Sequence, residues 1–217
     1  MGTISVGKLA GYSLMFGPVI ALICYFIAPG GALGIGGQIE PTNSAEVLAI
    51  ASGDYAYLAL ISSLILPVGL LVFISGLTFY AQSMEGGNGY AVARLGTPML
   101  LVAAAGWVLA SGVNLGIASE LITEGALADA SLSLNLMSGL IFGIGALLVT
   151  YAASTRADGN SKIAYAAALA SAVVAVVSVI SIVSPEEQAK NMSMITGICF
   201  VVFTVWSVIT GRKLASG

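Results

Sequence analysis

Glu120 and Glu124 are the residues whose type and spacing come closest to those of a catalytic pair. They lie four positions apart, so a helix through this segment would carry both carboxylates on one face. Such a pair is what an enzyme acting on lipid would need for acid–base catalysis. The pair is the basis of one hypothesis, that the chain is an enzyme acting on lipid, although no catalytic motif accompanies the two residues.

The chain contains no histidine. This removes haem ligation by imidazole, zinc, copper and di-iron sites that include histidine, and nucleophile systems of the Ser-His or Cys-His type. Redox and hydrolytic enzymes built into membranes usually depend on one of these. We therefore expect no catalytic residues, no metal site and no cofactor, and a function that is not enzymatic.

Asn114 and Asn135 are the most informative polar residues within the apolar segments. Hydroxyl groups there can bond to carbonyl oxygens of their own helix, but an amide cannot be satisfied by its own backbone alone. Each asparagine should therefore face protein or water, in the outer part of neighbouring helices where the two could meet. Two interpretations stay open. One is a contact between helices that contributes about 1 kcal/mol, and the other is the polar lining of a small-ligand pocket that opens outward.

Four glycines are spaced to bring helices close together. Gly112 and Gly116 form one Gly-x-x-x-Gly motif, and Gly139 and Gly143 form another. Two helix backbones can approach closely at such a motif. We therefore predict helix packing at both, although the motif does not identify a partner.

The composition indicates which solvent surrounds these residues. The apolar fraction is 58% and the charged fraction only 8%, where a soluble domain carries roughly 25% charged residues. So few charges could not cover a water-soluble surface, and the main partner of the chain is therefore a lipid bilayer. Cys24 and Cys199 both lie within apolar runs and are predicted to be small buried hydrophobes without a disulfide.

Charged residues divide the chain into six uncharged runs, each with the roughly 20 residues that a helix needs to cross about 30 Å of hydrocarbon. The prediction is an all-α, polytopic membrane protein whose six transmembrane helices form one bundle and a single domain over residues 1–217. The predicted spans are residues 9–29, 55–83, 95–118, 132–154, 163–183 and 192–211. No intramembrane charge marks an ion or proton pathway.

The distribution of basic residues predicts the orientation. Six of the seven fall on one side of a six-helix topology, and only Lys190 falls on the other. The six are Lys8, Arg94, Arg156, Lys162, Arg212 and Lys213. By the positive-inside rule both termini are cytoplasmic, and we expect the protein in the plasma membrane.

Residues 38–54 form the longest predicted outer segment. Asn43 and Glu46 have the spacing of a capping box, and an apolar stripe follows them. We predict a short helix over Ser44–Ser52 that lies in the outer interface of the membrane, and a similar segment over residues 120–129. Trp107 and Trp206, with several tyrosines near segment ends, partly fit an aromatic belt.

Two segments resemble a prokaryotic family of six-helix membrane proteins of unknown function. One is Lys8-Leu9-Ala10-Gly11. The other is residues 41–52, Pro-Thr-Asn-Ser-Ala-Glu-Val-Leu-Ala-Ile-Ala-Ser, which is similar to the outer segment that follows the first helix in that family. The likeness covers about the first third of the chain. It implies the same topology and carries no assigned site or reaction.

Two further hypotheses come from these features. The first is a structural or accessory subunit that binds membrane-protein partners or further copies of itself, because the chain lacks its own chemistry and has small-residue packing motifs. The second is a small transporter, channel or ligand-binding protein for a neutral or cationic solute, with Asn114 and Asn135 in its cavity. Nothing in the sequence indicates a nucleic-acid partner.

Overall fold

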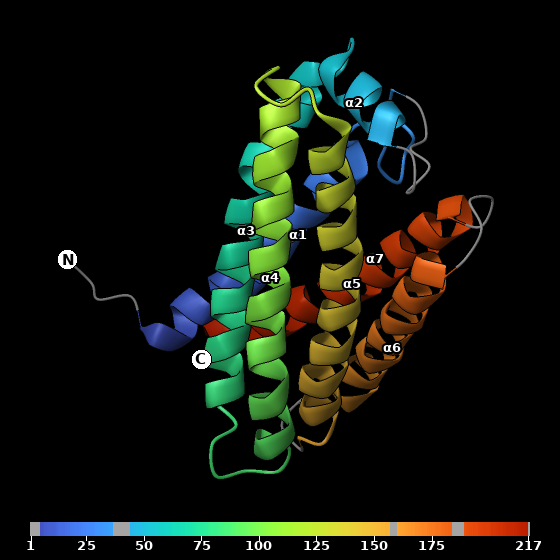
Figure 1. Ribbon diagram of the computed structural model, residues 1–217. Coiled ribbons are helices and arrows are strands. Elements are labelled where there is room, and N and C mark those ends of the chain that lie inside the picture. Colours follow the sequence, from blue (N-terminus) through green and yellow to red (C-terminus); the bar gives the residue numbers. More distant parts are fainter. Residues whose placement is uncertain (1–4, 37–43, 157–159, 184–188, 217) are drawn as a thin grey trace.

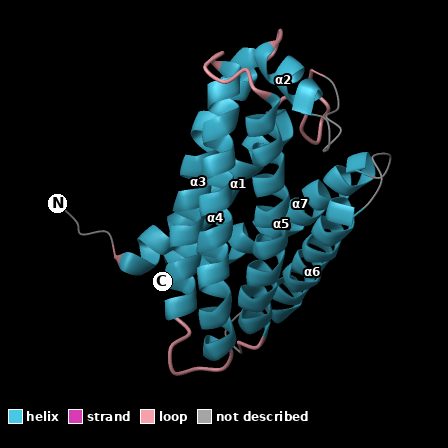
Figure 2. Cartoon of the chain, viewed as in Figure 1, coloured by secondary structure: helices cyan, strands magenta, loops and turns pink. Residues whose placement is uncertain are grey.

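The computed structural model describes residues 5–36, 44–156, 160–183 and 189–216, and every regular element in these ranges is an α-helix. The helices are α1 (Val6–Ile27), α2 (Ser44–Ser52), α3 (Ala56–Gln82), α4 (Tyr90–Ala118), α5 (Gly125–Ser154), α6 (Ser161–Val183) and α7 (Ala189–Ser216). All except α2 are long and apolar enough to cross a membrane. The expected all-α membrane bundle with six spanning helices is confirmed (Figure 2).

Several helices extend beyond the apolar runs from which they were predicted. α4 begins at Tyr90 and so includes Arg94, α5 begins at Gly125 and includes Asp129, and α7 continues past Arg212. A charge ends the stretch that can lie in hydrocarbon, but backbone hydrogen bonding continues into the headgroup region, where the charge is hydrated. Charge positions therefore mark the hydrocarbon boundary rather than the ends of the helices.

The six long helices form a closed ring. α1 packs against α3 and α7, α4 against α3 and α5, and α6 against α5 and α7. Figure 1 shows α6 and α7 inclined away from α4 and α5 toward the end of the bundle that carries α2. We call this the α2 end. The turn between α3 and α4 lies at the opposite end, together with the last turn of α5 and the first turn of α6.

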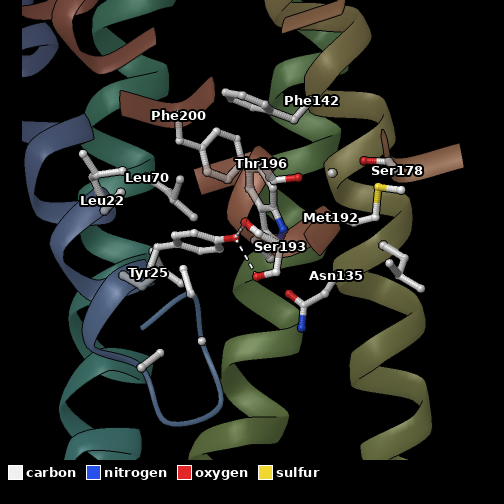
Figure 3. A pocket seen from close by; sticks show the side chains of 18 of the residues that line it. Leu22, Tyr25, Leu70, Asn135, Phe142, Ser178, Met192, Ser193, Thr196 and Phe200 are labelled. Carbon is white, nitrogen blue, oxygen red and sulfur yellow. Dashed lines mark hydrogen bonds between the residues drawn. The ribbon is translucent and has the colours of Figure 1, made fainter. Parts of the chain in front are cut away.

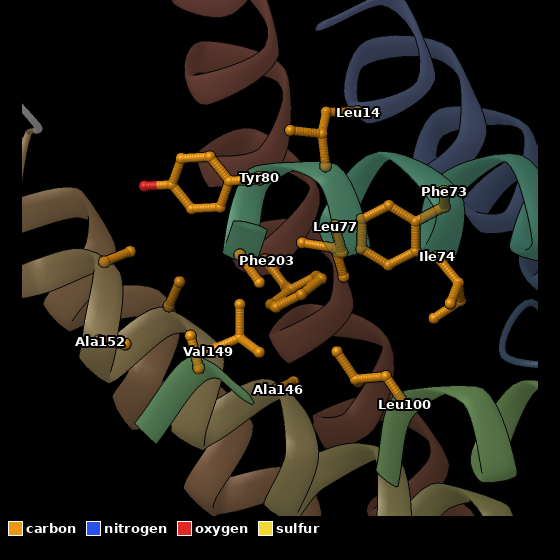
Figure 4. Close-up of a cluster of buried hydrophobic side chains, with 14 of the residues drawn as sticks. Leu14, Phe73, Ile74, Leu77, Tyr80, Leu100, Ala146, Val149, Ala152 and Phe203 are labelled. Carbon is orange, nitrogen blue, oxygen red and sulfur yellow. The ribbon is translucent and has the colours of Figure 1, made fainter. Parts of the chain in front are cut away.

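Buried apolar side chains fill the ring toward the opposite end. Leu14, Leu77, Leu100 and Val149 have at most 1% of their surface exposed, and they belong to one cluster with Phe203. Figure 4 shows these side chains converging from different helices. This core closes the bundle on the side away from α2.

α2 covers the ends of three long helices. Ala51 of α2 belongs to a small cluster with Ala59 of α3, Ile117 of α4 and Ala128 of α5. The predicted short helix over Ser44–Ser52 is therefore present, packed onto the bundle. Residues 38–43 of the predicted outer segment, with Asn43 of the capping box, lie outside the described residues.

Glycine permits backbone contact at several helix crossings. A Cβ added to Gly11 of α1 would lie 2.5 Å from the carbonyl oxygen of Gly211 of α7, and one added to Gly143 of α5 would lie 2.6 Å from the backbone nitrogen of Ala175 of α6. Real Cβ atoms essentially never come so close. Gly139, one turn before Gly143, is looser, with the Ser178 Oγ at 3.1 Å. The α5–α6 contact thus depends mainly on Gly143.

The other predicted packing motif does not bring two helices together in this chain. A Cβ on Gly112 would meet nothing within 4 Å, and the three atoms nearest to one on Gly116 all belong to Ile122, in the segment that follows the same helix. Gly112 therefore makes no close packing contact among the described residues, and Gly116 packs closely on the segment that follows α4. Gly112 faces outward on α4, because the face of α4 that meets α5 carries Gly96 instead, opposite Gly145.

One glycine from each motif gives a matched test of whether Gly143 lies in a helix contact and Gly112 at an open position. Gly143→Val should destabilise the bundle by about 1–3 kcal/mol, because the added methyl groups would collide with the α6 backbone. Gly112→Val introduces the same side chain at an open position and should change stability by less than about 0.5 kcal/mol. Thermal unfolding in lipid nanodiscs, followed by circular dichroism, measures both. Equal losses of stability would contradict the observed packing.

Candidate functional site

A cavity of about 420 Å³ occupies the ring in the half nearer the α2 end. All six long helices contribute to its walls, and the short segment after α1, residues 28–32, lies at its edge. Its volume falls within the range of ordinary small-molecule sites. The core cluster fills the ring on the far side, so the cavity stops at the core.

Aromatic rings form one wall of the cavity. Phe200 of α7 stands at its centre, with the rings of Tyr25 and Phe142 at centroid distances of 5.4 and 5.7 Å and interplanar angles of 83° in both cases. Trp107 lies 6.3 Å away at 85°. Edge-to-face pairs of this kind each contribute about 0.5–1.5 kcal/mol beyond burial. The wall is therefore held in place by its own contacts.

Asn114 is held by a hydrogen bond between helices. The Ser131 hydroxyl of α5 lies 3.0 Å from the Oδ1 of Asn114 on α4 and 3.3 Å from the carbonyl oxygen of Ala110. A hydroxyl has a single proton, so the two acceptors share it. Asn114 lines the cavity, and its carbonyl oxygen already has a partner.

Asn135 lines the same cavity but makes no hydrogen bond within the part of the chain that the structure describes. Figure 3 shows its amide extending from α5 into the space bordered by Tyr25 and Ser193. Two N–H donors and one carbonyl acceptor are therefore presented to the cavity. Asn114 and Asn135 reach one cavity, as the second interpretation of the sequence expected, but no hydrogen bond joins them.

Hydroxyl groups on α6 and α7 complete the polar lining. Ser178 and Ser181 each donate to a carbonyl oxygen of α6 at 2.9 Å, and their oxygens remain able to accept a bond from the cavity. Thr196 and Thr204 of α7 also line the cavity, and neither forms a hydrogen bond among the described residues. The cavity thus combines an aromatic wall with a set of uncharged hydrogen-bonding groups.

A polar contact between α1 and α7 lies at the edge of the cavity. The Tyr25 hydroxyl donates to the carbonyl oxygen of Ser193 at 3.1 Å and lies 3.3 Å from the Ser193 hydroxyl (Figure 3). Beside it, the segment after α1 turns back on itself, with the Gly30 nitrogen donating to the Ile35 carbonyl oxygen at 2.9 Å. Gly30 has φ of 71°, a left-handed conformation that glycine adopts readily.

Two expectations based on the sequence are corrected here. Glu120 and Glu124 do not share a helical face, because α4 ends at Ala118, Glu120 follows with φ of 58°, and Glu124 is the extended N-cap of α5. The segment 120–129 is therefore a short connection followed by the first turn of α5. Trp107 and Trp206 are not belt residues: Trp107 lines the cavity, and Trp206 is 2% exposed in the core.

The sequence analysis missed Tyr25, Trp107, Phe200 and Thr196 as lining residues. A usable signal was present, since Trp107 and Phe200 lie well inside their spans rather than near the ends where belt aromatics occur. Cys24 and Cys199 are both buried and form no disulfide, in agreement with the prediction.

Comparison with known proteins gives no relative: no family model matches the chain, and no curated protein or solved structure does so either. The resemblance to a six-helix prokaryotic family therefore stays a prediction.

The two tryptophans allow a direct test of access to the cavity. In Trp206→Phe, the remaining Trp107 lines the cavity, and in Trp107→Phe the remaining Trp206 is buried in the core. Because polar cavities hold water, the neutral quencher acrylamide should quench Trp107 roughly threefold more than Trp206. Stern–Volmer titrations of both variants in lipid nanodiscs measure this. Equal quenching would mean that the cavity is closed to small solutes.

Proposed function

We propose that this chain is a solute-binding membrane protein, which takes a small molecule into the cavity in the half of the bundle nearer the α2 end. The observation that carries the proposal is the Asn135 amide, which faces an apolar-walled cavity and has no hydrogen-bond partner among the described residues. No buried side-chain N or O atom of the described residues lacks a hydrogen-bond partner, so the Asn135 amide is accessible and offers its bonds to whatever occupies the cavity. A bound solute, or water in its absence, supplies the missing bonds.

The closed end of the cavity supports binding rather than an open pore. Phe73, Phe142 and Phe203 line the deep part and are at most 3% exposed, and all three belong to the core cluster. A solute that enters from the α2 end would stop against these rings. A site that is open on one side and closed on the other is the arrangement with which a carrier or a receptor binds its ligand.

The predicted orientation gives the direction of access. If the basic ends of the helices are cytoplasmic, as the positive-inside rule predicts, the α2 end faces outward. The described carboxylates near that end, Asp54, Glu120, Glu124 and Asp129, are all exposed, and none of them lines the cavity. We therefore propose that the solute enters from outside the cytoplasm.

A cavity-filling variant tests this function. Thr196→Trp on α7 would place an indole in the cavity, whereas Ile198→Trp places the same side chain two residues away at a position that is 59% exposed on the outside of the bundle. The unmodified chain, extracted from its host membrane into nanodiscs, should carry a small molecule at one copy per chain in native mass spectrometry. Thr196→Trp should lose this molecule and Ile198→Trp should retain it.

The same measurement bears on the second candidate, an accessory subunit. A subunit of a larger assembly would leave the membrane with other protein chains and an empty cavity. That result would contradict the solute-binding proposal and favour the accessory role. Retention of the small molecule in Thr196→Trp would also contradict the proposal, because the molecule would then be bound elsewhere.

A further inference from the structure

We propose that the cavity selects an uncharged, ring-bearing molecule with an amide-type group, and that Asn135 is the residue that determines this specificity. The inference rests on the proposed function and names the class of solute. It follows from three features of the lining: its lack of charge, the arrangement of its rings, and the different bonding of its two asparagines.

The lining favours an uncharged ligand. Among the described residues that form it there is no Asp, Glu, Lys or Arg. An ion that left water for this site would lose its hydration and meet no opposite charge, and ring faces alone compensate only a small part of that loss for a cation. Neutral molecules avoid this penalty. The exposed carboxylates near the α2 end lie outside the lining and do not change this conclusion.

The rings favour a flat apolar body. Tyr25 and Trp107 both stand nearly perpendicular to Phe200, at 83° and 85°. All three rings are partly exposed, whereas Phe73, Phe142 and Phe203 behind them are buried. Two walls perpendicular to a third give a ring-shaped ligand both stacked and edge-on contacts, the two geometries that aromatic pairs prefer.

Asn135 favours a ligand group that both donates and accepts hydrogen bonds. Its amide presents N–H donors and a carbonyl acceptor side by side, and none of them has a partner in the described structure. An amide, a lactam or a similar cyclic edge can form two antiparallel hydrogen bonds with it. An ester or ether can only accept, so it would leave the Asn135 carbonyl oxygen unpaired in an apolar site. Sites built in this way discriminate strongly against analogues that lack one partner.

Asn114 does not offer the same recognition. Its Oδ1 already accepts the Ser131 hydroxyl at 3.0 Å, which occupies one of its two acceptor lone pairs and ties the amide to α5, whereas the whole amide edge of Asn135 is available. This difference makes the two asparagines separable by experiment. It also places the donor-and-acceptor recognition on α5, in the same cavity as the ring of Phe200 on α7.

Four compounds with one ring in common test the inference. Benzamide both donates and accepts, methyl benzoate only accepts, benzoate is an anion and benzylammonium is a cation. Binding is measured by titrating Trp107 fluorescence in Trp206→Phe nanodiscs, with empty nanodiscs and Trp107→Phe as blanks. Benzamide should bind about tenfold or more tightly than each of the other three.

Asn135→Leu should weaken benzamide binding by about tenfold or more and leave methyl benzoate binding unchanged or tighter. Asn191→Leu makes the same exchange at an exposed position of α7 that does not line the cavity, and it should preserve the order of the four compounds. The far-ultraviolet circular dichroism of each variant verifies folding.

Tighter binding of an ion than of benzamide, or benzamide binding that does not depend on Asn135, would overturn the inference and leave the solute-binding function standing. Absence of binding by all four compounds would also overturn the inference. The proposed function itself would fail only if the chain extracted from its host membrane held no small molecule in the cavity.

Discussion

Close approach of helix backbones at small residues is the interaction on which the bundle depends. In lipid, apolar side chains gain nothing by leaving one hydrocarbon environment for another, so the helices are held by tight packing. Gly11 and Gly211 bring α1 and α7 into backbone contact at the end away from α2. Near the α2 end the rings of Tyr25 and Phe26 stand between the same two helices, beside Gly197. Toward this end α6 and α7 also incline away from α4 and α5 (Figure 1), and the cavity lies where these helices separate.

The divergence determines the chemistry of the cavity as well as its shape. On the tightly packed side, polar groups find partners in neighbouring helices: the Ser207 hydroxyl of α7 donates to the Leu14 carbonyl oxygen of α1 at 2.7 Å. On the open side some groups still pair between helices, as the Tyr25 hydroxyl does with Ser193, but the Asn135 amide has no partner among the described residues. Asn114 still reaches Ser131 because α4 and α5 remain close, whereas Asn135 points into the wider space. An unpaired amide is thus a direct consequence of how the helices are spaced.

The sequence was sufficient for the fold but not for the site. Charged residues bound each apolar run, so the number of spans could be read from their positions. The identical motifs at Gly112–Gly116 and Gly139–Gly143 could not be distinguished, because only the neighbouring helix decides whether a glycine is covered. The two asparagines were equally ambiguous for the same reason. Both could be placed in the correct half of the bundle, but their different bonding depends on Ser131, whose position across the α4–α5 contact no spacing rule gives.

The free-energy cost of leaving the cavity empty gives an indication of its function. A sealed dry void is costly, at about 24 cal/mol per Å³ of missing packing, whereas the cavity of about 420 Å³ is partly open. A partly open space of this kind holds water, lipid or a solute. Lipid chains would leave the polar lining unpaired, and water would wet the aromatic wall without any gain from its rings. A molecule with a ring at one end and a hydrogen-bonding group at the other satisfies both surfaces together. This complementarity between Phe200 on one side and Asn135 on the other is the strongest physical reason to regard the cavity as a binding site.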